Sequence, residues 1–135
     1  MINTPVATRR VTVFDALGGD AALAAAVDGL YDRLGADPLL APYFVGRDMS
    51  HLKRHLRIFL AAALGGPHIY RGRDLRSAHA PLGITAQGWD RTIMHLLAVL
   101  AELAVSPELT EQIVAHLAPL REQIVSASDA NTVAT

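Results

Sequence analysis

Apolar side chains recur at helical spacing along most of this chain, in segments that glycine and proline interrupt. The clearest interruptions are Gly18-Gly19 and Gly65-Gly66-Pro67. Between such breaks the apolar residues follow one another by three or four positions, which places them on one face of a helix. Almost no segment alternates as a β-strand would. The pattern therefore predicts an all-α fold, and 135 residues suffice for one domain.

Polar residues that can accept hydrogen bonds from a first helical turn predict where the helices begin. We expect Asp20 to cap Ala21–Leu34, Asp48 to cap Met49–Leu64, Thr85 to cap the next helix, and Ser106-Pro107 to open the last. Asp37-Pro38 would start a short segment that ends at Phe44, and a further short helix is expected at Leu75–Ala80. Val11–Leu17 is either a brief helix or an extended entry. Residues 1–10 and 127–135 are expected to be flexible tails around a domain at 11–126.

The composition excludes several classes of function. The 12 basic and 13 acidic residues nearly cancel, and no run of Lys or Arg suggests a nucleic acid or an anionic membrane as partner. Without cysteine, disulfides and thiolate sites are impossible. The N-terminus lacks the pattern of a secretory signal, and the most apolar segment, His95–Val105, is too short to span a bilayer. We therefore expect a soluble cytoplasmic protein.

Six histidines are the conspicuous reactive groups. His51 and His55 are four residues apart on one predicted helix and could share a metal ion, but the motif lacks an acidic residue, and solvated side chains explain the pair better. His79 lies beside the apolar residues Leu75, Ala78 and Leu82. A haem iron requires one neutral imidazole on an apolar wall, because the porphyrin supplies four nitrogens itself. From spacing alone, His79 is either such a ligand or a surface histidine.

A haem would also need a second helix facing His79. Met49–Leu64 is the candidate, since Leu52, Leu56 and Leu60 lie on its apolar face with Phe59, and His55 borders that face. Tyr31 is the one hydroxyl on the apolar face of Ala21–Leu34. Its phenol could bond a ligand on the iron, or it could belong to a core ring whose hydroxyl reaches water.

These residues belong to a longer series of motifs that resembles group I of the truncated haemoglobins, the two-over-two helical globins. The resemblance covers about residues 12 to 125. It is carried by Phe14–Gly19, Tyr31 within Val27–Leu34, Tyr43-Phe44, Asp48–Lys53, Phe59–Pro67, Tyr70–Gly72, Ala78-His79 and Ala118–Leu120. It implies two helix pairs crossing around a b-type haem, with a very short proximal helix that matches Leu75–Ala80.

The resemblance also assigns roles to individual residues. It implies that His79 is the proximal iron ligand, that Phe44 packs on the porphyrin, and that Tyr31 hydrogen-bonds the bound ligand. Lys53 and Arg76 would reach the haem propionates, where charge-assisted hydrogen bonds form. The remaining pocket would be lined by Leu60, Leu75, Ile84, Trp89, Ile93 and Leu117, with Leu52 and Leu56 on the distal side.

Two departures from the common family pattern bear on the site. Leu52 and Leu56 stand where many members carry distal glutamines, so Tyr31 would hold a ligand with less help. His55 matches the position from which one branch supplies a second, internal iron ligand. Arg121 stands about where that branch carries the histidine that bonds haem covalently, so we expect non-covalent haem b.

Three functions follow as hypotheses. The first is a haem protein that reversibly binds oxygen, NO and CO. It could also convert oxygen and NO to nitrate. The electrons would come from an external reductase, because the sequence has no flavin or nicotinamide motif. The second is a bis-histidine haem protein for electron transfer or redox sensing, for which His55 is the support. The third is a haem-free helical module that recognises a partner. A monomer or weak dimer is expected.

Overall fold

The computed structural model describes residues 11–66, 79 and 82–125. Every regular element in these ranges is helical, which confirms the all-α prediction. The elements are α2 (Val13–Leu17), α3 (Gly19–Ala36), the 3₁₀ helix η1 (Ala41–Phe44), α4 (Met49–Ala63), α6 (Ala86–Glu102), α7 (Pro107–Leu117), the 3₁₀ helix η3 (Ala118–Leu120) and α8 (Arg121–Ile124).

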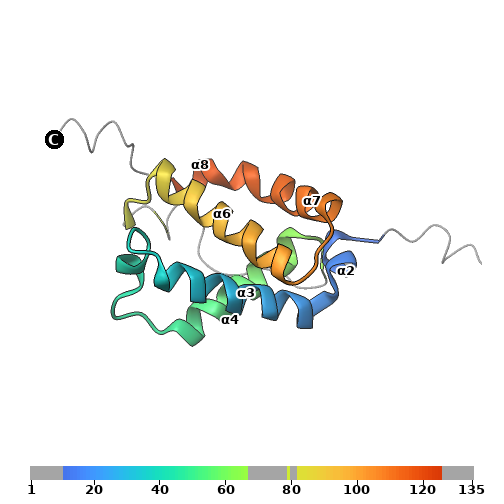
Figure 1. Ribbon diagram of the computed structural model, residues 1–135, viewed down its shortest axis with the longest axis horizontal. Coiled ribbons are helices and arrows are strands. Elements are labelled where there is room, and N and C mark those ends of the chain that lie inside the picture. Colours follow the sequence, from blue (N-terminus) through green and yellow to red (C-terminus); the bar gives the residue numbers. More distant parts are fainter. Residues whose placement is uncertain (1–10, 67–78, 80–81, 126–135) are drawn as a thin grey trace, which may run out of the picture.

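The long helices form two pairs, one packed on the other (Figure 1). α3 packs against α4 in one pair, α7 lies beside α6 in the other, and α3 crosses α6 where the pairs meet. This is the two-over-two arrangement. Within the described ranges, no helix combines the length and apolarity needed to cross a bilayer.

Three predicted helix starts are confirmed by their side-chain caps. The Asp48 carboxylate accepts from the His51 amide at 3.2 Å, and the Thr85 hydroxyl accepts from the Gly88 amide at 3.0 Å. Ser106 caps α7 in the same way, with proline at the first helical position. A cap of this kind stabilises its helix by about 1 kcal/mol, because it satisfies an amide that the first turn leaves unpaired.

Two predicted starts are wrong. α3 begins at Gly19 rather than Ala21, so Asp20 lies inside the first turn; the break before it falls at Gly18, whose φ of 123° suits glycine. Asp37 ends α3 instead of opening the next helix, which begins only at Ala41. At the N-terminal end, 13–17 is helical and not extended. Of the helix predicted at Leu75–Ala80, only His79 lies within the described residues, and its backbone is helical.

The packed core lies mainly toward the α2 end of the molecule. Val27, Leu64, Val99 and Leu100 are almost completely buried there. Gly29 lets α3 approach α6 closely, because a β-carbon at this position would lie only 3.1 Å from Val99. The C-terminal half of α3 and the N-terminal half of α6 border a cavity instead of this packed core.

Candidate functional site

A cavity of about 260 Å³ lies between the two helix pairs, away from α2. Its walls come from α3, η1, α4, α6 and α7, with η3, α8 and the residues His79, Leu82 and Ile84 completing them. Most of the lining is aliphatic or aromatic. The lining residues are Leu30, Tyr31, Leu34, Leu40, Tyr43, Phe44, Arg47, Leu52, Leu56, Phe59, Leu60, His79, Leu82, Ile84, Trp89, Thr92, Ile93, Leu96, Leu117, Leu120 and Ile124.

Tyr31 brings a hydroxyl to this apolar cavity from α3. Burial raises the pKa of its phenol to about 12, so the group keeps its proton at any ordinary pH. The Phe44 ring packs edge-on against it, with centroids 5.6 Å apart and planes at 80°. The phenol is therefore a hydrogen-bond donor whose ring is held by a neighbouring aromatic.

His79 contributes an imidazole to the same cavity. Its side chain is half-buried, and Leu82 and Ile84 line the wall just after it in the chain. It is the one histidine among the lining residues that the structure describes. In the same ranges, no three His, Asp or Glu side chains gather where they could hold a metal ion by themselves.

This donor set suits an iron porphyrin. The group needs one imidazole for the iron, apolar walls for the macrocycle, and cations near its edge for the propionates. His79 could supply the imidazole, the helices named above supply the walls, and Arg47 is among the lining residues. The residues present therefore fit a haem.

Most of the residues expected from the sequence meet at this cavity. Those among its lining are Tyr31, Phe44, Leu52, Leu56, Leu60, His79, Ile84, Trp89, Ile93 and Leu117. Leu75 and Arg76 lie outside the described residues. Tyr43 and Arg47 are among the lining residues that the sequence did not predict, although Tyr43 precedes Phe44 directly and Arg47 is the first cation after it.

Two of the expected residues are not brought to the cavity. Lys53 lies on the side of α4 that faces α3, where its ammonium is 3.4 Å from the Asp28 carboxylate. His55 is exposed, and its ring lies against that of His51 with centroids 4.3 Å apart. Among the described lining residues, the basic side chain besides His79 is that of Arg47.

Comparison with known proteins agrees with this geometry. Residues 12–126 match the family described as bacterial-like globin. The chain is 36% identical over 115 residues to a group 1 truncated haemoglobin of Mycolicibacterium paratuberculosis, covering 85% of each chain. A group 1 truncated haemoglobin of a Nostoc species is 38% identical over 100 residues, which cover 74% of this chain and 85% of the relative.

Solved structures show the same fold. The truncated haemoglobin of Tetrahymena pyriformis in its Fe(III) form matches with a TM-score of 0.81 at 30% identity, covering 84% of this chain and 97% of that one. The 2/2 haemoglobin of a Synechococcus species, which carries covalently attached haem, matches with a TM-score of 0.81 at 32% identity. The match covers 84% of this chain and 98% of that one. Sequence, fold and cavity thus lead to one family: the chain belongs to the group 1 truncated haemoglobins.

Proposed function

We propose that this globin holds non-covalent haem b in the cavity, with His79 as the axial ligand, and reversibly binds oxygen, NO and CO. The observation that carries the proposal is that His79 and Tyr31 line one apolar cavity. When bound, the haem supplies an iron at which a diatomic gas can bind. The protein supplies the imidazole, excludes water and orients the gas.

Tyr31 is the hydroxyl best placed to orient the gas. Among the described lining residues, the Thr92 hydroxyl donates to the Gly88 carbonyl at 2.8 Å, and the Tyr43 hydroxyl lies 3.5 Å from the Gly83 carbonyl. No hydrogen bond within the described ranges occupies the Tyr31 hydroxyl, so we propose that its hydrogen is donated to a ligand. Leu52 and Leu56 offer no second donor from α4, so we propose that Tyr31 alone provides the hydrogen bond.

Non-covalent attachment is proposed because of Arg121. It is exposed on α8, about where the covalent branch of the family carries its histidine. A guanidinium remains protonated at ordinary pH and is not a nucleophile. Extraction of haem by acidified butanone should therefore leave the protein colourless, whereas haem that stays with the protein would show a covalent bond.

The chemistry that we propose is dioxygenation of nitric oxide. One oxygen molecule, one nitric oxide molecule and one electron combine into nitrate, so the atoms and the charge balance. The electron must come from an external reductase, because the sequence has no flavin or nicotinamide motif. The apolar walls exclude water, and Tyr31 keeps the oxygen oriented while nitric oxide enters.

The test is the visible spectrum of the purified, haem-supplied protein, with and without CO. The wild type should hold one haem per chain, and His79→Ala should lose it or hold it loosely with an altered spectrum. His116→Ala is the matched control, because His116 is an exposed histidine on α7 whose ring bonds the Gln112 carbonyl. A His79→Ala protein with tight haem and an unchanged spectrum would show that the assignment is wrong.

A further inference from the structure

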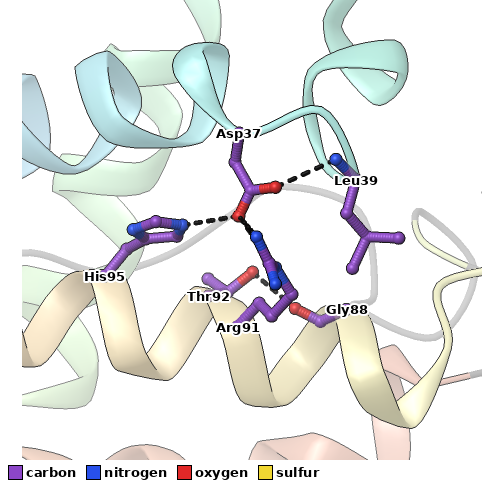
Figure 2. A network of polar contacts seen from close by, with 6 residues as sticks. All are labelled: Asp37, Leu39, Gly88, Arg91, Thr92 and His95. Carbon is purple, nitrogen blue, oxygen red and sulfur yellow. Dashed lines mark hydrogen bonds and ion pairs between the residues drawn. The ribbon is translucent and has the colours of Figure 1, made fainter.

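A buried carboxylate lies where α3 ends, outside the set of residues that line the cavity. The Asp37 side chain is only 1% exposed. One of its oxygens accepts from Arg91 Nε at 2.9 Å and lies 2.7 Å from His95 Nε2, and the other accepts from the Leu39 amide at 2.9 Å (Figure 2). Two elements far apart in sequence thus meet at one acidic group.

The carboxylate stays charged because its partners compensate for burial. An unpaired charge in this position would destabilise the fold, whereas hydrogen-bonded ion pairing offsets that cost. The hydrogen bond from His95 is the main cause that lowers the pKa of Asp37 to about 2, with Arg91 and the Leu39 amide contributing. The carboxylate is therefore charged throughout the neutral pH range.

This cluster also fixes the start of η1. The Asp37 carbonyl accepts from the amides of Leu40 at 3.0 Å and Ala41 at 2.8 Å. Leu40 packs close to Gly88, where an added β-carbon would lie 3.7 Å from it. The segment that leads to Phe44 is thus attached to α6 at its first residue, and Phe44 ends it edge-on to Tyr31.

The same turns of α6 carry residues that contact Asp37 and residues that line the cavity. Arg91 and His95 reach toward Asp37, as Figure 2 shows, while Ile93 and Leu96 line the cavity. A change in how Asp37 binds α6 would therefore be transmitted to η1 and to the cavity wall. Interiors transmit such shifts because they are closely packed.

We propose that Asp37, held by Arg91 and His95, is a positioning residue for the gas ligand. It keeps η1 against α6, so that Phe44 stays beside Tyr31 and the phenol hydroxyl keeps its direction into the cavity. The proposal rests on the proposed function, in which Tyr31 donates to the bound gas. Asp37 itself does not touch the ligand.

A second ion pair between the same two helices provides a matched control. Arg33 of α3 bonds Glu102 of α6, and neither residue lines the cavity. Both side chains are at least one third exposed. Glu102→Gln therefore removes an α3–α6 ion pair and one negative charge, as Asp37→Asn does, without touching the segment that carries Phe44.

The first measurement is the oxygen dissociation rate of the haem-bound protein, together with the CO stretching band of its CO complex. Asp37→Asn keeps the size of the side chain and an acceptor for the Leu39 amide. We expect it to raise the dissociation rate about three- to tenfold and to shift the CO band, because a misdirected hydrogen bond weakens. Arg91→Gln, at a partly exposed site, should change both in the same direction, and Glu102→Gln should change neither.

A double substitution separates positioning from general destabilisation. In a Tyr31→Phe background there is no hydroxyl to misdirect, so Asp37→Asn should add little to the dissociation rate. An Asp37→Asn effect that is equally large in that background, or no larger than that of Glu102→Gln, would overturn the proposal.

A measurement independent of gas binding keeps the two proposals distinguishable. The nuclear Overhauser cross-peak between the Tyr31 and Phe44 rings can be recorded with or without haem. It should weaken in Asp37→Asn and persist in Glu102→Gln. Its persistence in Asp37→Asn would overturn the positioning role. A wild type that takes up no haem would overturn the proposed function and with it the role toward the gas, and the cross-peak would still show whether Asp37 positions the two rings.

Discussion

At the scale of single residues, we propose the phenol of Tyr31 as the group that discriminates among ligands. Its pKa of about 12 keeps the donor hydrogen in place, and the cavity around it is mostly apolar. A hydrogen bond in such surroundings contributes about 1–3 kcal/mol. Ligands that accept a hydrogen bond well, such as oxygen, should depend on Tyr31 more than CO does.

Tyr31→Phe removes this donor and leaves the ring packing with Phe44 in place. We expect oxygen dissociation to become about five- to hundredfold faster, with haem retained, since 1.4 kcal/mol corresponds to about tenfold. Stopped-flow displacement of oxygen by CO measures the rate. Tyr43→Phe is the control, because its hydroxyl lies near the Gly83 carbonyl. A rate equal to that of the wild type would contradict the role of Tyr31.

His55 needs a separate test, because its predicted role as an internal iron ligand stays untested. Its ring is exposed and lies against His51, with Arg54 and Arg57 close by in the sequence. Coordination would require α4 to turn this side chain into the cavity. The outward arrangement favours a ferrous iron without His55.

We therefore expect a broad, five-coordinate ferrous spectrum at neutral pH that His55→Leu leaves unchanged. His51→Leu serves as the control for removing an imidazole from the same surface. Sharp low-spin bands in the wild type that His55→Leu converts to a five-coordinate spectrum would instead establish the internal ligand. The observed oxygen affinity would then be the intrinsic affinity multiplied by the fraction of molecules in which His55 is not bound to the iron.

The sequence predicted residues of the cavity wall better than the charges at its edge. Leu52, Leu56 and Leu60 follow the helical period, so their common face could be derived. Lys53 follows Leu52 directly, and a step of one residue turns about 100° around a helix, which is enough to face α3 instead. Arg47 lies before the helix, where periodicity gives no direction.

At the scale of elements, local signals were predictable and distant ones were not. The caps at Asp48, Thr85 and Ser106 act on amides three residues away, so the sequence displays both partners. Asp37 resembles such a cap in sequence, yet its main partners lie 54 and 58 residues away. Periodicity and turn chemistry carry no information about that pairing, which depends on how α3 crosses α6.

The Asp37 pairing makes a prediction about acid stability. Its folded-state pKa of about 2 lies below the ordinary value of 3.8, so the carboxylate stabilises the fold fully above pH 3.8. This contribution is lost as the pH falls from about 4 through about 2. The free energy of unfolding should therefore decline more steeply in the wild type than in Asp37→Asn over that window.

Urea denaturation of the haem-free chain at several pH values between about 6 and 2.5 measures this difference. The difference in the free energy of unfolding between wild type and Asp37→Asn should be largest at pH 5 to 6 and should become smaller below about pH 4. Glu102→Gln should follow the wild-type slope, because it leaves Asp37 paired. A gap that does not change with pH would contradict the role of the Asp37 charge.

At the scale of the whole molecule, the fold divides into a packed end and a hollow end. Val27, Val99 and Leu100 fill the interior toward α2, whereas about 260 Å³ stays open between the other ends of the helix pairs. Side chains around an empty apolar space lack packing partners on that side. A haem that fills the space would therefore complete the core as well as bind gases.

Haem should accordingly stabilise the whole fold, and His79 should be needed for that effect. A ligand that binds only the folded chain adds RT ln(1 + [L]/Kd), or about 2.7 kcal/mol when its free concentration is a hundredfold above Kd. For a domain of this size that corresponds to a rise in Tm of roughly 10 °C. Thermal unfolding followed by circular dichroism, at increasing haem concentration, measures the rise.

In His79→Ala the unfolding curve should shift far less at equal haem concentration, because the iron would lose its protein ligand and only apolar contacts would remain. His116→Ala should match the wild type. If His79→Ala gained the full wild-type increment, the porphyrin would be held by the cavity walls alone, and His79 would have no part in joining the cofactor to the fold.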